Sequence, residues 1–170
     1  MEANKIRSKG KQMKSASAEE RPDQSGLDVT NRLFFRLFQV GNILHRQTAN
    51  ELGISGVQWA VMGALSRPKA THGMSFSELA EYLVVSRQNL DGVLKRLERE
   101  EHVSRVTSDE DRRARRVVLT SKGRQFWEEL QPKIHEFYRQ AVINLRFDDK
   151  VSFLHYMNTL KGDLSTVHLT

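Results

Sequence analysis

The stretch "SELAEYLVVSRQNLDGVLKRLE", residues 77–98, contains two short helical patterns with a break between them. Apolar residues recur at helical spacing in the first pattern, and Ser75 with Glu78 three residues later forms the sequence of a capping box. "VVSRQN" interrupts the periodicity, and Ser86 can cap a second helix over residues 87–100. Two short helices joined by a tight turn have the outline of a helix-turn-helix unit.

The second of these helices has two chemically different faces. At about 100° per residue, Leu90, Leu94 and Leu97 fall on one stripe. Amides and bases can bond to base edges and phosphates, so the opposite face has the chemistry for the major groove of DNA. The alternative is an ordinary amphipathic helix with a solvated face. The polar face carries Gln88, Asn89, Gly92, Lys95, Arg96 and Arg99.

A hairpin is predicted directly after this helix. The β-rich runs "VSRVT" and "RRVVL", residues 103–107 and 115–119, flank a charged segment, and residues 105–116 hold five arginines and three acids. We expect the tip to reach the minor groove, where Arg113 gains from concentrated negative potential and Asp111 orients its guanidinium. The alternative is a solvated loop.

The rest of the chain is predicted to be helical, which gives a mainly α fold with a small β-hairpin wing. Periodicity predicts a helix over residues 27–52 and another capped by Ser55. After the hairpin, one helix is expected from Ser121, with a kink at Pro132, and a last one from the acidic pair 148–149.

These elements predict three regions in the chain. Residues 1–26 are expected to form a disordered basic tail, which serves either for solubility or as an arm that touches phosphate. Residues 53–120 are expected to form a winged helix-turn-helix lobe that binds DNA. Residues 27–52 and 121–170 are expected to form a helical region, and its first helix is expected to pack against its own core and against a second subunit, because it is apolar on two faces.

Composition narrows the class of protein. The 170 residues carry a net charge of +6, which favours polyanionic partners, and they include no cysteine, which excludes disulfides and thiolate metal sites. No apolar run reaches the roughly 18 residues of a membrane span, and the N-terminus lacks the apolar middle of a signal peptide. We therefore expect a cytoplasmic protein that does not associate with membranes.

Signals of catalysis are weak in this sequence. The six histidines are scattered without a His-x-x-x-His pair, and there is no glycine-rich phosphate loop and no nucleophile elbow. We expect neither an enzyme, nor a metal site, nor a cofactor.

The segment "DRRARRVVLTSKG", residues 111–123, resembles the wing of the MarR/SlyA family of winged-helix regulators. In that pattern Asp-x-Arg precedes an apolar strand and Leu-Thr-x-x-Gly, and the resemblance extends over residues 27–165. The chain departs from the family at Glu101 and His102, where Gly-Leu is usual. The helix over residues 87–100 is therefore expected to end without a left-handed glycine. The wing pattern is matched by Asp111, Arg113, Val117, Leu119, Thr120 and Gly123.

The resemblance implies a homodimer whose helical dimerisation region comprises residues 27–52 and 121–170. It implies that the dimer reads a pseudo-palindromic operator in double-stranded DNA. It also implies release of the DNA by a small effector, and hence a transcription regulator that most simply acts as a repressor. A winged-helix module that binds protein, or one that binds DNA without specificity, is the alternative. The expected DNA contacts are Ser86, Arg87, Gln88, Asn89, Gly92, Lys95, Arg96, Asp111, Arg113 and Arg115.

An effector pocket is implied between the first two helices, which wall it in the family. Aromatic acids and their CoA thioesters are common effectors there, and Arg36 or His45 could neutralise a carboxylate. The alternative is that the aromatic residues are plain core. The expected apolar lining is Phe34, Phe38, Trp59 and Met62.

Overall fold

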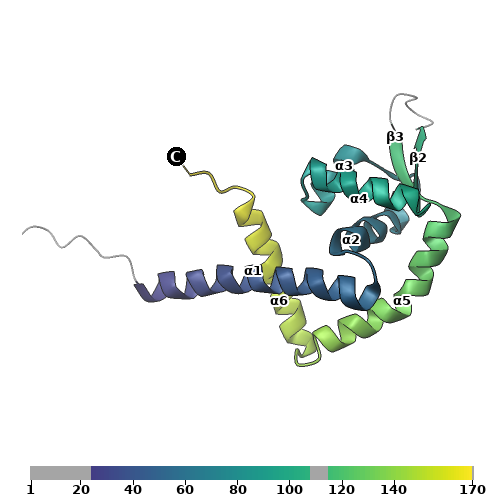
Figure 1. The fold of residues 1–170 in the computed structure, drawn as a ribbon. Helices are drawn as coiled ribbons and strands as arrows, with labels where there is room; N and C mark the ends of the chain where they lie inside the picture. The colour runs from purple at the N-terminus through teal and green to yellow at the C-terminus, as the bar shows by residue number, and fades with distance from the viewer. Residues whose placement is uncertain (1–23, 108–114, 170) are drawn as a thin grey trace, which may run out of the picture. The chain divides into compact units, whose positions relative to one another are not determined.

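The computed structural model describes residues 24–107 and 115–169 (Figure 1). It confirms a mainly helical fold with a small antiparallel sheet at the wing. Among the described residues, no helix is both long enough and apolar enough to cross a membrane. The elements are α1 (Gln24–Leu52), α2 (Gly56–Leu65), the 3-10 turn η1 (Pro68–Ala70), β1 (Met74–Ser75), α3 (Phe76–Leu83), α4 (Arg87–Arg99), β2 (Val103–Thr107), β3 (Arg115–Leu119), α5 (Ser121–Ala141) and α6 (Phe147–Leu164).

The chain divides into two units, of which the first ends at Val40 and the second begins at Gly41. In the first, residues 24–40 are a stretch of α1 whose large apolar side chains are mostly exposed. The predicted tail lies largely outside the described residues, but Gln24 to Gly26 belong to α1, so the prediction that this helix begins at Leu27 was wrong by three residues. The second unit contains the winged-helix lobe.

The helices of the lobe begin at residues whose side chains cap the N-terminus by hydrogen bonds. At α2, the Gln58 N–H donates to Ser55 Oγ at 3.2 Å, and the Ser55 N–H donates to Gln58 Oε1 at 3.0 Å. Ser75 and Glu78 form the same reciprocal pair at α3, and Ser86 accepts from the Asn89 N–H at α4. The predicted caps are therefore confirmed, and each satisfies backbone donors that the helix itself leaves free.

The strands form a three-stranded antiparallel sheet in the order β1-β3-β2. The predicted hairpin pairs Val103 with Leu119 and Thr107 with Arg115. The sequence did not predict β1, which pairs Met74 with Val117 on the other edge of β3. This strand has only two residues and exists because β3 lies beside it, so it has no periodicity of its own.

The core of the lobe is built from the apolar faces of α2, α3, α4 and the sheet. Leu90, Leu94 and Leu97 of α4 are fully buried in it. A second cluster joins Leu52 and Ile54 to Leu130 and Ile134 of α5. The buried side chains of the first cluster are Val61, Met62, Ala64, Leu65, Leu79, Leu90, Leu94, Leu97, Val103, Val117 and Leu119.

Two helices follow the sheet. α5 is continuous through Pro132 and bends along its length (Figure 1). α6 begins at Phe147, ahead of the predicted acidic pair, because the Asp149 carboxylate accepts from the Arg146 N–H at 2.9 Å and makes Arg146 the cap. No residue of α6 is buried.

α4 ends without a glycine, as expected, yet its backbone takes the conformation that a glycine would favour. Glu101 takes the left-handed conformation, with φ of 62°. The Glu101 N–H donates to the Glu98 carbonyl at 3.0 Å, and the His102 N–H donates to the Leu97 carbonyl at 2.9 Å. These two bonds make a Schellman motif, so the helix ends as a glycine would end it, at the steric cost of a side chain in that conformation.

Candidate nucleic-acid interface

The exposed face of α4 carries the side chains that the sequence predicts there. Gln88, Asn89, Lys95 and Arg96 are exposed, whereas the leucines of the opposite stripe are fully buried. Gly92 lies in the middle of the polar face, and an added Cβ would meet no atom within 4 Å. The face is therefore open, and its centre is low enough to let a neighbouring molecule approach the backbone.

Two residues at the start of α4 are tied into the turn that precedes it. Ser86 caps the helix through its Oγ, 3.2 Å from the Asn89 nitrogen. Arg87 donates from Nη2 to Ser77 Oγ at 3.2 Å, and its guanidinium lies 5.7 Å from the centre of the Phe76 ring. The turn thus fixes where α4 begins and how it is presented.

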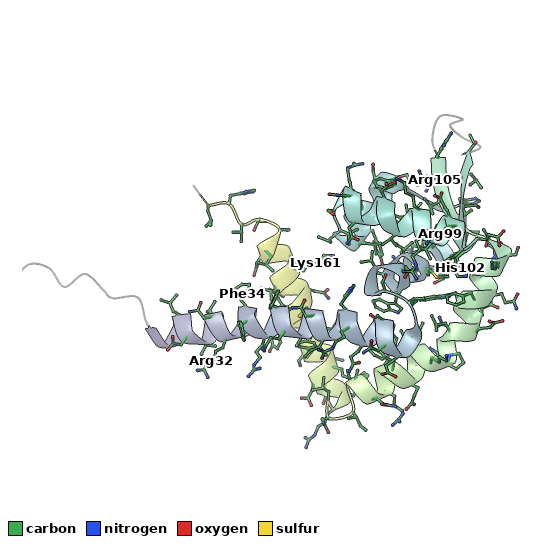
Figure 2. All side chains as sticks on the ribbon, in the orientation of Figure 1. Arg32, Phe34, Arg99, His102, Arg105 and Lys161 are labelled. Atoms are coloured by element: carbon green, nitrogen blue, oxygen red, sulfur yellow. The ribbon has the colours of Figure 1, made fainter. Side chains whose placement is uncertain are left out.

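The basic residues of α4 differ in how they are held. Lys95 pairs with Asp91 at 2.7 Å, and Arg96 Nε donates to Glu100 Oε1 at 2.9 Å. Arg99 has no hydrogen bond or ion pair with any residue in 24–107 or 115–169. Figure 2 places Arg99 and Arg105 where α4 meets the hairpin.

Only part of the wing falls within the described residues. Asp111 and Arg113, which were predicted to enter the minor groove, lie outside them. Arg115, the first residue of β3, is exposed. Arg105 of β2 bonds to Glu98 Oε1 at 2.7 Å, which fastens the wing to α4.

One arginine of the wing is structural. Arg116 turns toward the loop before β1, where Nη2 donates to the Gly73 carbonyl at 2.9 Å and pairs with Glu78 at 3.2 Å. The hydrogen bond from the Ser75 N–H, followed by the Ser75 hydroxyl and Arg116, lowers the pKa of Glu78, although partial desolvation opposes this. The charge density of the segment therefore serves packing as well as the surface.

A shallow groove of about 290 Å³ lies between α4 and the N-terminal end of α2. Gln88, Asn89, Gly92 and Arg96 line it from α4, and Gln58 lines it from α2. The predicted base-reading residues thus share one surface hollow. The sequence did not single out Gln58, because the identity of a residue does not show whether a capping glutamine is exposed or buried.

The residues predicted to bind an effector fall in both units of the chain. In the first, Phe34 and Phe38 are exposed and Arg36 donates to Gln39 at 2.9 Å. In the second, His45 is exposed and Met62 is fully buried in the core of the lobe. Within residues 24–107 and 115–169, no cluster of three His, Asp or Glu side chains could hold a metal ion.

Trp59 of α2 lies against α5. Its ring meets that of Tyr138 edge-on, with centroids 6.4 Å apart. The indole Nε1 is buried and has no hydrogen bond of ordinary geometry with any described residue. Burial raises the pKa of Tyr138, although the nearby indole N–H lowers it in part. No pattern in the sequence pointed to Tyr138, because it follows Phe137 on a helix with many apolar positions.

Comparison of the sequence with known proteins identifies a family and several relatives. Residues 52–114 match the model of the MarR family. The chain is 46% identical over 135 residues to the transcriptional activatory protein BadR of Rhodopseudomonas palustris, with 77% of each chain covered. It is 32% identical over 100 residues to the homoprotocatechuate degradative operon repressor of Escherichia coli, with 59% of this chain and 66% of the relative covered.

Solved structures show the same fold. A MarR/EmrR family transcriptional regulator from Acinetobacter sp. ADP1 aligns with a TM-score of 0.69 at 15% identity, over 84% of this chain and 98% of the other. The family consists of transcription regulators and not of enzymes. The chain therefore belongs to the MarR family of winged helix-turn-helix transcription regulators, which bind DNA.

Proposed function

We propose that the protein is a homodimeric, ligand-responsive regulator that binds a pseudo-palindromic operator through α4 and the wing. The observation that carries this proposal is the α4 surface, where exposed amides and bases surround the open backbone at Gly92. Amide side chains pair bidentately with adenine, and basic ones with guanine or phosphate. The proposed DNA contacts are Ser86, Arg87, Gln88, Asn89, Gly92, Lys95 and Arg96 on α4 and Asp111, Arg113 and Arg115 on the wing.

Exposed apolar side chains support the dimer. In α6, Phe147 is 77% exposed and Leu154 is 62% exposed, and no residue of this helix is buried. In the first unit, Phe35 and Phe38 are 60% and 66% exposed. Apolar surface of this extent is unfavourable in water, so a second copy of the chain is its natural cover. A dimer would present two copies of α4 to two half-sites about one helical turn apart.

We propose repression as the default mode, since binding at an operator blocks transcription most simply. A second candidate is activation, which is favoured by the relative named a transcriptional activatory protein at 46% identity. The two are distinguished by a reporter gene placed beside the DNA that the protein selects. Repression predicts that reporter output falls when the protein is supplied, and activation predicts that it rises.

The proposed effector is an aromatic carboxylic acid or its CoA thioester, held near Trp59. The indole N–H is buried and has no hydrogen-bond partner among the described residues, so it can donate to such a ligand, and His45 would neutralise the charge of the ligand. Phe34, Arg36 and Phe38 belong to the first unit and stay predictions drawn from the family resemblance, whereas the buried position of Met62 assigns it to the core of the lobe. We expect a matching aromatic acid to release the protein from its selected duplex, measured by fluorescence anisotropy. Unchanged anisotropy across a panel of such acids and thioesters would contradict this effector class.

The role of Gly92 gives a direct test of the α4 surface. Gly92→Ala should raise the free energy of unfolding by about 0.5–1 kcal/mol, because alanine favours helix and the added methyl meets open space. The same methyl should weaken binding of the selected duplex by about tenfold, because it pushes α4 away from the base edges. Chemical denaturation and anisotropy measure the two effects.

Gly162→Ala provides the matched control. Gly162 is also helical and exposed, with no atom within 4 Å of an added Cβ, and it lies in α6, outside the lobe. It should show the stability gain without the loss of affinity, at a protein concentration at which sedimentation shows both variants to be dimers, because α6 is itself proposed to take part in the dimer. Equal DNA affinity of Gly92→Ala and the wild type would show that α4 does not approach DNA at this position.

A further inference from the structure

The guanidinium of Arg96 is already oriented in the free protein. Its Nε donates to Glu100 Oε1 at 2.9 Å, and its terminal nitrogens make no hydrogen bond with the residues of 24–107 or 115–169. The guanidinium group is planar, so an acceptor fixed at Nε also fixes the direction of the two terminal nitrogens. The terminal nitrogens of Arg96 are therefore held in one direction and make no hydrogen bond with another described residue.

The carboxylate that holds Arg96 is itself anchored. Glu100 Oε2 accepts from Gln58 Nε2 of α2 at 3.4 Å, a long bond. Gln58 is only 2% exposed, and its Oε1 accepts from the Ser55 N–H at 3.0 Å, so the amide has little freedom to turn. The position of Glu100 thus depends on α2 as well as on α4.

His102 lies on the other side of the same carboxylate. Its Nδ1 is buried, has no hydrogen-bond partner among the described residues, and lies 3.8 Å from Glu100 Oε2. Its ring stacks on Phe126 of α5, with centroids 4.4 Å apart. Glu100 is therefore the point where contacts from α2 and from the start of the wing converge on a residue of the α4 surface.

A second ion pair on α4 differs from the Arg96–Glu100 pair in how its carboxylate is held. Lys95 and Asp91 also form an ion pair one turn apart, at 2.7 Å, but their side chains are 69% and 42% exposed. Asp91 also lies 3.9 Å from Arg105 Nη2 through its other oxygen, but no buried amide among the described residues holds it, and exposed pairs of this kind contribute little. The Arg96 and Glu100 side chains are 56% and 33% exposed, and Glu100 differs from Asp91 in accepting a hydrogen bond from the buried amide of Gln58.

The groove beside α4 links this anchor to recognition. Arg96 and Gln58 line it together with Gln88 and Asn89. A fork held at the edge of this groove is placed to contact the same stretch of DNA as the two amides. A preorganised donor loses less entropy on binding than a free arginine does.

We propose that Glu100 is a positioning residue for DNA recognition, which acts by holding the Arg96 fork at the edge of the α4 groove. The inference rests on the proposed function, in which α4 enters the major groove. In this proposal the Glu100 carboxylate, which by itself would only repel phosphate, contributes to sequence specificity. The family motif does not include this position, and the sequence pattern does not single it out.

Glu100→Gln tests the proposal because it keeps the shape and removes the charge-assisted bond. The probes are a duplex that the wild-type protein enriches from a random-sequence pool, and a scrambled version of it. We expect the affinity ratio between these two duplexes to fall about threefold to tenfold, because a neutral acceptor holds a guanidinium less firmly. Binding to the scrambled duplex should be unchanged or stronger, because a negative charge has been removed.

Glu101→Gln is the matched control. It removes the same charge one residue away, where the carboxylate pairs with Lys122 at 2.8 Å and has no contact with Arg96. It should strengthen binding to both duplexes equally and leave their ratio within about twofold, as expected for a long-range charge effect. A fall in the ratio that is equal in the two variants would overturn the proposal.

A double-mutant cycle with Arg96→Ala separates positioning from a structural effect. If Glu100 acts through Arg96, Glu100→Gln should not change the ratio further once Arg96 is alanine. A further fall in that background would show that Glu100 acts on the fold, and would overturn the proposal. Failure of the wild-type protein to enrich any duplex would instead contradict the proposed function, so the two failures are distinguishable.

Discussion

Gly123→Ala is expected to lower the free energy of unfolding by about 2–3 kcal/mol, because the new methyl has no room. Gly123 lies in the first turn of α5, directly against the backbone of His102, and an added Cβ would overlap the His102 carbonyl oxygen. That carbonyl cannot move freely, because it accepts from the Thr120 N–H at 3.1 Å. The substitution should separate the start of α5 from the end of α4.

Denaturant unfolding at a fixed protein concentration measures this effect. Gly162→Ala serves as the comparison, because the identical change in open space should raise the free energy of unfolding by about 0.5–1 kcal/mol. Equal unfolding midpoints for the two variants would contradict the close packing of Gly123 against His102. The glycine at position 123, the last residue of the wing motif, would then need an explanation other than lack of space for a side chain.

Gln88→Ala is expected to change base preference at one position of each half-site by about 1–3 kcal/mol, which corresponds to as much as about a hundredfold. Gln88 is exposed in the first turn of α4 and lines the groove beside Asn89. A base edge that has lost its amide partner should no longer be preferred, while affinity for the other positions should persist. Binding to a set of duplexes with single substitutions measures the preference.

The control for this experiment is Gln125→Ala. Gln125 is an exposed glutamine of α5 whose amide donates to Glu129 at 2.8 Å. Removing it should leave every duplex in the set unchanged. A uniform loss of affinity for Gln88→Ala across all duplexes would show that Gln88 contacts the phosphate backbone and does not read a base.

Local patterns in the sequence predicted the helices of the lobe. Ser55, Ser75 and Ser86 act as caps because each needs only the backbone of its own helix. The leucine spacing of α4 predicted both its buried stripe and its polar face, and the structure confirms both. These features depend on residues within one or two turns of one another.

What the sequence did not predict depends on partners far along the chain. β1 forms because β3 supplies its hydrogen bonds, and Arg116 turns inward because the loop at Gly73 offers it a carbonyl. Glu101 takes a conformation that favours glycine because the Schellman hydrogen bonds and the start of β2 require it. Gln58 and Glu100 meet across 42 positions of sequence, so their role at the groove has no local signal.

In the proposed function, α4 and the wing of a dimer read a specific sequence in duplex DNA. The most direct test is selection of genome fragments by the purified protein at near-physiological salt, followed by affinity for the enriched duplex and for a scrambled one. Specific recognition predicts an enriched inverted repeat that binds at least about 10³-fold more tightly than the scrambled duplex. Weak and equal affinities would favour a winged helix that binds protein, and tight but equal affinities would favour non-specific DNA architecture. Either result would contradict specific recognition by α4 and the wing.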